Sequence, residues 1–301
     1  MTYTRKCLKG LVVTYNSLLN RLTPTLKIHS WGGFGSQLYT LHLALQIRTK
    51  YPWRKLLVVI HSSGVTRRFS ELDWNLFGIQ ASEINDFKKA DIFSKEFNYK
   101  SVPNRIISLT KKVGSEALEI MRIVQTANSD KSLKNVKYWT MSLRGHYTNL
   151  TLNPEILYTI YSKLSLEPAS TDVLESDLVI HYRLGDLLTL NQKSPIPHQR
   201  VDNLLKGMLK ESNSCVVLTD SSQFDYQEFT RDSIFLKSLE SRKLNPYETL
   251  SLCIRAKHFI GTGAKLTIWA AIFRQYVYGK QSHLPQELMW TKPSGVNSYW
   301  Y

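Results

Sequence analysis

Cysteines are scarce in this chain of 301 residues, and acidic residues are missing from its first 70 positions. Cys7, Cys215 and Cys253 are too few and too scattered for a disulfide framework or a zinc site, which is typical of a protein of the reducing cytoplasm. No apolar run approaches the roughly 20 residues that cross a bilayer. Polar residues interrupt the apolar stretch near the N-terminus, so we interpret it as part of the mature protein rather than a signal peptide. The alternative is a membrane-associating helix.

Residues 1–70 contain no Asp or Glu but eleven Lys and Arg, and the whole chain has a net charge of +15. A field of this sign attracts nucleic acid, anionic lipid headgroups or a phosphate-bearing acceptor. A basic surface without a function would have the same composition, so charge alone does not choose among these. No helix-turn-helix, zinc finger or RNP-like aromatic strand is present in the sequence, which argues against nucleic acid.

The pattern Asp-x-Asp is also missing from the sequence. Enzymes that hold a diphosphate through a divalent cation generally supply paired carboxylates for the metal. Its absence favours stabilisation of a diphosphate by arginine and by helix dipoles. We therefore expect no metal site and no cofactor.

Strand-like apolar runs alternate with helix-like periodic segments along most of the chain, which predicts an α/β fold with mainly parallel sheets. The length suits two domains, with a junction near residues 147–154, and we expect them to span 1–150 and 151–301. The expected strands are 26–30, 56–61, 178–182, 215–219 and 258–260. The expected helices are 37–50, 201–209, 246–256 and 266–276, with another beginning at Pro154.

A glycine-rich turn, Trp-Gly-Gly-Phe-Gly-Ser-Gln-Leu at 31–38, separates the first expected strand from the first helix. Gly33 and Gly35 would let the backbone approach a ligand, and the helix N-terminus offers N–H groups to an anion. The spacing is not Gly-x-Gly-x-x-Gly, so a dinucleotide fingerprint is not supported. A purely structural turn is the alternative.

A second polar segment, His-Tyr-Arg-Leu-Gly-Asp at 181–186, directly follows an apolar strand. Open α/β sheets bind ligands at the carboxyl ends of their strands. Arg183 could grip a diphosphate there with two hydrogen bonds and neutralise charge as a sugar–phosphate bond breaks. The alternative is a plain ion pair between Arg183 and Asp186.

Two further segments in the second half also follow expected strands. Asp220 could accept hydrogen bonds from a base or ribose, or simply cap the next helix. The glycine-bearing loop at 261–263 leads into a helix, which makes a second potential phosphate cradle with Thr262, Lys265 and Thr267 as donors. It lacks the Gly-x-x-x-x-Gly-Lys spacing of a Walker loop.

Together these segments resemble the α-1,2-fucosyltransferases (glycosyltransferase family 11) and the related α-1,6- and protein O-fucosyltransferases. That family opens with Gly-Gly-Leu-Gly-Asn-Gln-Leu-Phe, where residues 32–39 read Gly-Gly-Phe-Gly-Ser-Gln-Leu-Tyr. Its central His-x-Arg-Arg-x-Asp corresponds to 181–186, and its Ser-Asp-Asp to 219–221. Further correspondences to its Gly-Tyr-Phe-Gln, Met-Ser-Leu-Cys-Lys and Asn-Ser-Thr-Phe-Ser-Trp-Trp-Ala-Ala motifs follow the same order, at 145–147, 250–253 and 267–271.

The resemblance implies a GT-B fold, with two Rossmann-like domains facing a cleft and the nucleotide sugar held mainly by the second. It implies that Arg183 contacts the donor diphosphate, that His181 and Asp220 lie on the nucleotide side, and that Thr267 lies near the β-phosphate. It also implies an inverting, metal-independent transfer of fucose from GDP-fucose to a glycan acceptor. The first glycine loop would help to close the cleft.

This chain departs from the family at several positions. Leu184 replaces the second arginine, and Ser36 and Ser221 replace an Asn and an Asp. Lys265 places a cation where the family has small polar residues. These departures keep a second donor open, such as a CMP-activated ulosonic acid or another hexose.

The base that removes the acceptor proton has three candidates, Asp186 first, then His29 and Asp73. Gln37 joins the last two on the acceptor side. The acceptor would be a glycan, including a lipid-linked one, and the basic face would let a cytoplasmic enzyme dock on an anionic membrane. The alternatives to this function are a basic nucleic-acid-binding protein and an inactive relative that only binds carbohydrate.

Overall fold

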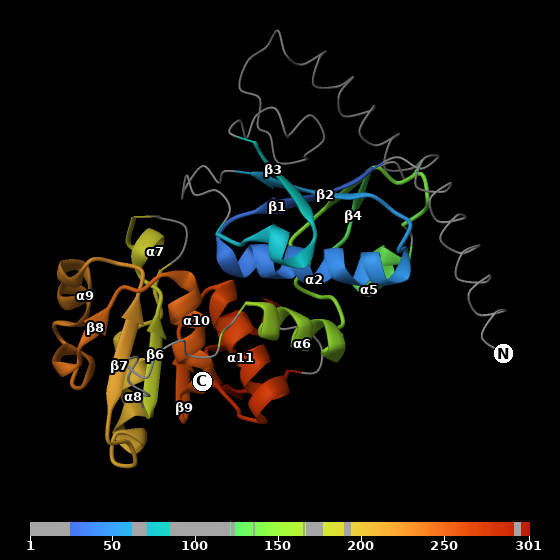
Figure 1. Ribbon diagram of the computed structural model, residues 1–301. Coiled ribbons are helices and arrows are strands. Elements are labelled where there is room, and N and C mark those ends of the chain that lie inside the picture. Colours follow the sequence, from blue (N-terminus) through green and yellow to red (C-terminus); the bar gives the residue numbers. More distant parts are fainter. Residues whose placement is uncertain are drawn as a thin grey trace, which may run out of the picture. The chain divides into compact units, whose positions relative to one another are not determined.

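The computed structural model describes residues 25–61, 71–84, 121, 124–134, 136–164, 166, 177–189, 194–291 and 296–301. The basic residues before position 25, together with Arg67 and Arg68, lie outside the described residues. The chain divides into two compact units, 1–150 and 151–301, and each is treated by itself below (Figure 1).

The described strands of the first unit form one parallel sheet in the order β3-β2-β1-β5-β4. The apolar run at 56–61 forms β2, and its last four side chains are buried, as expected for an inner strand. The chain order reverses at β1, so the carboxyl end of β1 lies at the switch point of this sheet, where α/β proteins bind ligands. The strands are β1 (Leu26–Trp31), β2 (Leu56–His61), β3 (Gln80–Ile84), β4 (Val124–Thr126) and β5 (Ser142–Arg144).

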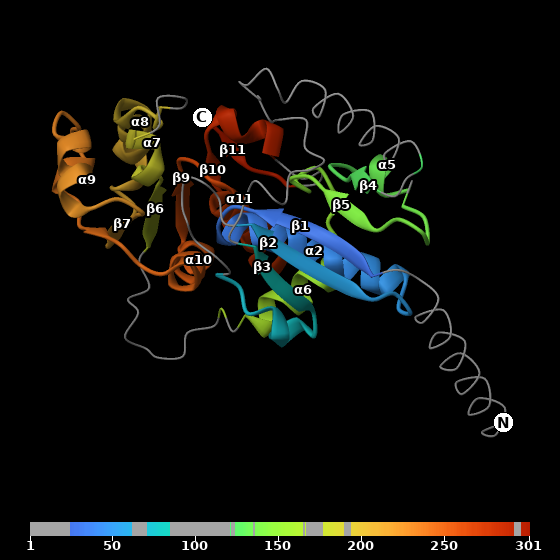
Figure 2. The same cartoon turned by 90° about the horizontal axis from the view of Figure 1, so that it is seen from above.

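Helix α2 (Phe34–Lys50) runs along one face of this sheet (Figures 1 and 2). Thr40 Oγ1 donates to Ser30 Oγ at 2.9 Å, which joins the helix to β1. Side chains alternate along a strand and β1 pairs with β2 in register, so His29 and His61 point to the opposite face. The remaining described helices of the unit are the 3-10 helix η1 (Trp74–Phe77) and α5 (Asp130–Leu133).

The described strands of the second unit form a parallel sheet in the order β11-β10-β9-β6-β7-β8. Counted from β6, this is the 3-2-1-4-5-6 order of a dinucleotide-binding Rossmann sheet, and its switch point lies between β6 and β9. The strands are β6 (Leu178–Tyr182), β7 (Cys215–Thr219), β8 (Ser241–Arg242), β9 (His258–Gly261), β10 (His283–Leu284) and β11 (Tyr299–Trp300).

Several helices of the second unit begin at residues that favour helix starts. Asn245 and Glu248 form a capping box at the start of α10, and Asn153 caps α6 ahead of Pro154. The described helices are α6 (Pro154–Lys163), α7 (Gly185–Thr189), α8 (His198–Met208), α9 (Gln223–Thr230), η2 (Leu236–Ser238), α10 (Pro246–Arg255), α11 (Lys265–Tyr278) and η3 (Gln286–Thr291). None of the helices in the described ranges is both long and apolar enough to span a bilayer.

The predicted α/β class, with two parallel-sheet Rossmann-like domains, is confirmed by this topology. The expected strands all form. Helix α2 begins three residues earlier than expected and α8 begins at His198 rather than Val201. Both early starts depend on contacts or on a preceding proline that periodicity does not report.

A buried cation holds the edge of the second unit together. Arg274 in α11 is fully buried, and its guanidinium donates to backbone carbonyls rather than to a carboxylate. These carbonyls belong to Cys253, Ile254, Ala256, Lys257 and Gln281. Four of them lie at or just beyond the carboxyl-terminal turn of α10, where a positive charge complements the helix dipole.

We predict that Arg274→Met lowers the free energy of unfolding by about 3 kcal/mol or more, because several buried carbonyls lose their donor at once. Denaturant unfolding of the two proteins measures the difference. Arg242→Met is the matched control, since Arg242 pairs with Glu240 at the surface and should cost less than about 1 kcal/mol. Equal costs for the two variants would contradict a structural role for Arg274.

Candidate functional site

The carboxyl ends of β6 and β9 are joined by a single threonine. The Thr262 backbone N–H donates to the His181 carbonyl at 3.1 Å, and the Arg183 backbone N–H donates to Thr262 Oγ1 at 3.0 Å. The loop after β9 then passes the Arg183 side chain, since a Cβ on Gly263 would lie 3.6 Å from Arg183 Cβ. The structure therefore brings Arg183 and Thr262 together at the switch point of the sheet.

His181 and Thr267, both buried, form a second link across the same two loops. His181 Nδ1 and Thr267 Oγ1 are 2.7 Å apart, and the Thr267 hydroxyl also donates to the Gly263 carbonyl. The hydroxyl proton is thereby committed, so His181 is assigned as the Nδ1–H donor. Burial lowers the pKa of His181 and keeps the ring neutral, against the opposing effect of Asp220. A Cβ on Gly261 would overlap the Thr267 methyl group, which explains the glycine there.

Helix α11 begins directly after this loop with a strained residue. Ala264, the N-cap, has φ 80° and ψ 153°, a region that essentially only glycine occupies, at a cost of about 1–3 kcal/mol. Its side chain caps no amide, so the N-terminus of this 14-residue helix relies on other groups to complement its positive dipole. Lys265 is the first helical residue, and Arg183 packs beside the same loop.

Asp220 positions the loop that follows β6. Its Oδ1 accepts hydrogen bonds from the Leu184 and Gly185 backbone N–H groups, each at 2.9 Å. A Cβ on Gly185 would lie 2.5 Å from Asp220 Oδ2, so only glycine fits there without a shift. The carboxylate thus holds the start of α7. The expectation that Asp220 caps the helix that follows it is wrong, because Ser222 caps that helix, α9, by accepting from the Asp225 backbone N–H. A contact between Asp220 and a nucleotide stays a prediction.

Two other residues of the segment 181–186 bear on the predicted site, Leu184 and Asp186. Leu184, where the family has its second arginine, is fully buried in the core of the second unit. Position 184 therefore faces the core in this chain and not the loop surface. Asp186 lies in α7, but its side chain is outside the described residues, and its role as a base stays a prediction.

The glycine turn of the first unit holds a carboxylate from its own chain. Glu71 Oε2 accepts from the Phe34 backbone N–H at 2.5 Å, at the first residue of α2. The buried Gln37 fixes this arrangement, because its Oε1 accepts from the Glu71 and Leu72 backbone N–H groups at 3.1 and 3.2 Å. Its Nε2 donates back to the Gly32 carbonyl at 3.3 Å.

Glu71 therefore occupies the place where the sequence suggested an external anion. Gly33 and Gly35 lie in this turn, and a Cβ on Gly33 would be 3.1 Å from Glu71 Oε2. Their contact with a donor stays a prediction, and the contacts give Gln37 a structural role. No local sequence signal reveals this cap, because Glu71 and Phe34 are 37 residues apart in the chain.

His29 belongs to a stack of three rings at the carboxyl ends of β1 and β2. Its Nδ1 lies 2.8 Å from His61 Nε2, and Trp31 stacks on His61 at 4.6 Å between ring centroids. Burial, followed by the charge of Arg144, lowers the pKa of His29 to about 3 and that of His61 to about 4. Both rings are neutral at pH 7, and a ring with so low a pKa is a weak base. Sequence reasoning missed His61.

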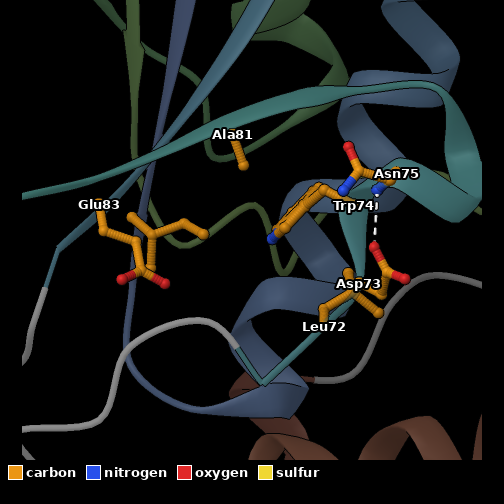
Figure 3. A pocket seen from close by; sticks show the side chains of 7 residues that line it. Leu72, Asp73, Trp74, Asn75, Ala81 and Glu83 are labelled. Atoms are coloured by element: carbon orange, nitrogen blue, oxygen red, sulfur yellow. Dashed lines mark hydrogen bonds between the residues drawn. The ribbon is translucent and has the colours of Figure 1, made fainter.

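Asp73 lies at a cavity of about 280 Å³ on the α2 side of the sheet (Figure 3). Its Oδ1 accepts from the Asn75 backbone N–H at 3.0 Å, which begins η1. The Trp74 indole projects into the cavity toward the side that carries Glu83 of β3. The other lining residues are Ile60, Leu72 and Ala81. An aromatic ring with carboxylates around it offers a flat apolar face and hydrogen-bond acceptors, a combination suited to a small polyhydroxylated ligand.

No group of three or more His, Cys, Asp or Glu side chains in the described part of the chain is placed to hold a metal ion. The cysteines Cys215 and Cys253 are unpaired by disulfides, and burial raises the pKa of the Cys215 thiol to about 12. Neither is activated as a nucleophile.

No protein-family model matches the sequence, and no curated protein matches it. Solved structures with a similar course of the chain include the glycosyl transferase family 9 protein from Veillonella parvula (10% identity, TM-score 0.42, 93% of this chain and 86% of that one). E. coli heptosyltransferase WaaC with ADP has 10% identity and a TM-score of 0.44 over 87% of each chain. POFUT1 in complex with GDP has 9% identity and a TM-score of 0.38 over 87% of this chain and 98% of that one. Similarities of this size do not assign an activity.

The buried histidines make the stability of the protein dependent on pH. The folded pKa values of His29 and His61 lie below the ordinary 6.5, so between pH 6.5 and about 4 the unfolded chain binds more protons. We expect the contribution of these histidines to the free energy of unfolding to be constant well above pH 6.5, where neither state binds the proton, and to fall as the pH is lowered through 6.5 toward 4. In His29→Gln the fall between pH 6.5 and 5 should be smaller, as measured by urea unfolding. The same pH slope in both proteins would show that His29 is not buried as a neutral ring.

The strain at Ala264 predicts that a substitution there stabilises the protein. Ala264→Gly should raise the free energy of unfolding by about 1 kcal/mol, because the relief of strain exceeds the entropy that glycine adds to the unfolded chain. Thermal unfolding measures the change. Ala256→Gly, at a C-cap with φ −42°, has no strain to relieve and should destabilise. A loss of stability in both variants would refute the strained conformation.

Proposed function

We propose that this protein is a glycosyltransferase of the GT-B type that transfers a sugar from a nucleotide-sugar donor to a carbohydrate acceptor without a metal ion. The observation that carries the proposal is that Arg183 packs beside the loop that leads into α11, a helix whose first residue is Lys265, at the switch point of a Rossmann sheet. Three sources of positive charge gather there around a loop held by Thr262 and Thr267.

The chemistry that suits such a loop is departure of a nucleoside diphosphate. As the bond between the sugar and the β-phosphate breaks, negative charge grows on the phosphate oxygens. The planar guanidinium of Arg183 can donate two parallel hydrogen bonds to them, and Lys265 adds a point charge. His181, a neutral Nδ1–H donor to Thr267, keeps the loop in place without adding a competing charge. No divalent cation is needed for this stabilisation.

The acceptor side of the proposal lies in the first unit. The cavity between η1 and β3 has room for one small sugar, with the Trp74 indole as its apolar wall. Asp73, an exposed carboxylate at this cavity, would take the proton of an acceptor hydroxyl in an inverting transfer. Compared with the buried, neutral His29, Asp73 is the better base. Asp186 remains the first alternative to it.

GDP-fucose is the first choice of donor, and the support for it is the collinear set of fucosyltransferase-like segments in the sequence. The acceptor would be a glycan hydroxyl in polysaccharide or glycoconjugate synthesis, in an α-1,2 linkage. Lys265 and Leu184 depart from that family, so a CMP-ulosonic acid or another hexose donor is the second choice. Thermal-shift measurements with GDP, UDP, CMP and ADP distinguish them, since the true nucleotide should raise the Tm most.

Arg183→Ala should lower turnover of the nucleotide sugar by more than about 100-fold, because it removes a contact that strengthens as charge grows on the leaving group. Arg183→Lys should retain part of the activity, since it keeps the charge but loses the two-pronged geometry. Sugar transfer or donor hydrolysis, measured with excess EDTA, is the readout.

Arg242→Ala is the control, because Arg242 lies at the surface in an ion pair with Glu240 and should leave turnover unchanged. Near-normal turnover in a folded Arg183→Ala protein would remove the central residue from the proposal. Loss of wild-type activity on adding EDTA would show that a metal ion holds the diphosphate instead.

A further inference from the structure

A turn at the amino edge of the first sheet is held rigidly by a buried arginine. Arg54 donates to the Lys137 carbonyl at 2.8 Å and to the Thr140 carbonyl, and its side chain is buried. Thr140 closes the turn from within, because its Oγ1 accepts from the Lys137 backbone N–H at 3.0 Å. We refer to residues 137–140 as the clamped turn. The buried guanidinium therefore fixes the shape of this turn.

The clamped turn displays large hydrophobic side chains to solvent. Tyr138 is 63% exposed and Trp139 is 40% exposed, with their rings edge to face at 4.6 Å. Trp139 Nε1 donates to the Met121 carbonyl at 2.9 Å, which brings a third exposed side chain, Met121, alongside. Met141, directly after the turn, is 47% exposed. A cluster of exposed large apolar side chains marks an interaction surface rather than ordinary surface composition.

Lysines surround this cluster. Lys27 and Lys55 are exposed at the starts of β1 and β2, and the Lys27 backbone N–H donates to the Met141 carbonyl at 2.8 Å. Lys137 is the first residue of the turn, and the exposed Lys134 precedes it in the sequence. Asp130 is the only carboxylate in the described residues between 121 and 150. The partner of this surface therefore carries negative charge around an apolar interior.

We propose that the clamped turn, with Met121 and Met141, inserts into the headgroup region of an anionic membrane while the neighbouring lysines contact lipid phosphates. Tyr and Trp are the side chains that favour the boundary between water and lipid, because their rings are apolar and their edges carry a donor. Each lysine near the surface adds an attraction to acidic lipids. This inference goes beyond the proposed function and does not depend on it.

Two other partners fit the surface less well. A single-stranded nucleic acid stacks its bases on parallel ring faces in a groove, whereas the exposed rings of Tyr138 and Trp139 lie edge to face beside two methionines. A second copy of the chain in a two-fold interface would bring the same lysines face to face and repel. A membrane satisfies both the apolar and the charged parts of the surface.

If the clamped turn inserts into the membrane, the cavity of the first unit stays accessible. The clamped turn lies at the amino edge of a parallel sheet, whereas Ile60 and Glu83 of the cavity lie near the carboxyl ends of β2 and β3. Strands of six residues separate the two edges by roughly 15–20 Å. A docked unit therefore holds its cavity above the headgroups.

Co-sedimentation of the full chain with lipid vesicles tests this inference. We expect binding to vesicles of phosphatidylcholine with 30% phosphatidylserine and at least tenfold weaker binding to pure phosphatidylcholine. Tyr138→Ala/Trp139→Ala should weaken binding to the acidic vesicles by at least tenfold, because two rings lose their insertion. Tyr158→Ala, at a 68% exposed tyrosine on α6, is the matched control and should bind like the unchanged protein.

A second measurement separates insertion from charge attraction alone. Vesicles with brominated acyl chains should quench tryptophan fluorescence of the unchanged protein, and Trp139→Phe should remove most of that quenching while retaining at least half of the binding. Binding that is unaffected by the double alanine substitution would overturn the proposal, as would no binding at all. Loss of nucleic-acid binding or of a dimer in the double variant, with vesicle binding unchanged, would assign the surface to that partner instead.

Discussion

The site of the second unit depends on how two parallel strands end side by side. Strands β6 and β9 are neighbours in the sheet but belong to halves that run away from each other, so the loops beyond them must separate. Thr262 prevents the separation locally by bonding to the backbone of both His181 and Arg183. This link holds the backbone of Arg183 against the loop that leads into α11. Under the proposed function, this fixed backbone would reduce the ordering needed when a diphosphate binds.

The two units share a glycine-containing loop before a long helix, but they differ in what lies at the helix N-terminus. Each has a loop with glycines that leads from a strand into a long helix, and each helix N-terminus attracts an anion. In the first unit Glu71 supplies that anion from the protein itself. In the second unit the N-cap Ala264 supplies no side-chain bond and Lys265 adds positive charge. This contrast favours the second unit as the place for an external diphosphate.

Much of this arrangement could be predicted from sequence because it is local. The apolar runs at 56–61 and 178–182 predict buried strands, and the polar residues that follow them predict a ligand edge. The Glu71 cap could not be predicted, since it joins residues 37 apart along the chain. The burial of Leu184 and the positive φ of Ala264 could not be predicted from the sequence either, because they depend on how loops fold over a core formed by distant residues.

The most direct test of the central claim is calorimetric titration of the protein, in EDTA, with GDP, UDP and ADP and with the nucleoside of each. The expected result is that one nucleoside diphosphate binds without metal and at least tenfold more tightly than its nucleoside, since most of the recognition lies at the phosphates. Equal affinity for nucleoside and diphosphate, or binding that requires added Mg²⁺, would contradict a cradle made of Arg183, Lys265 and the start of α11.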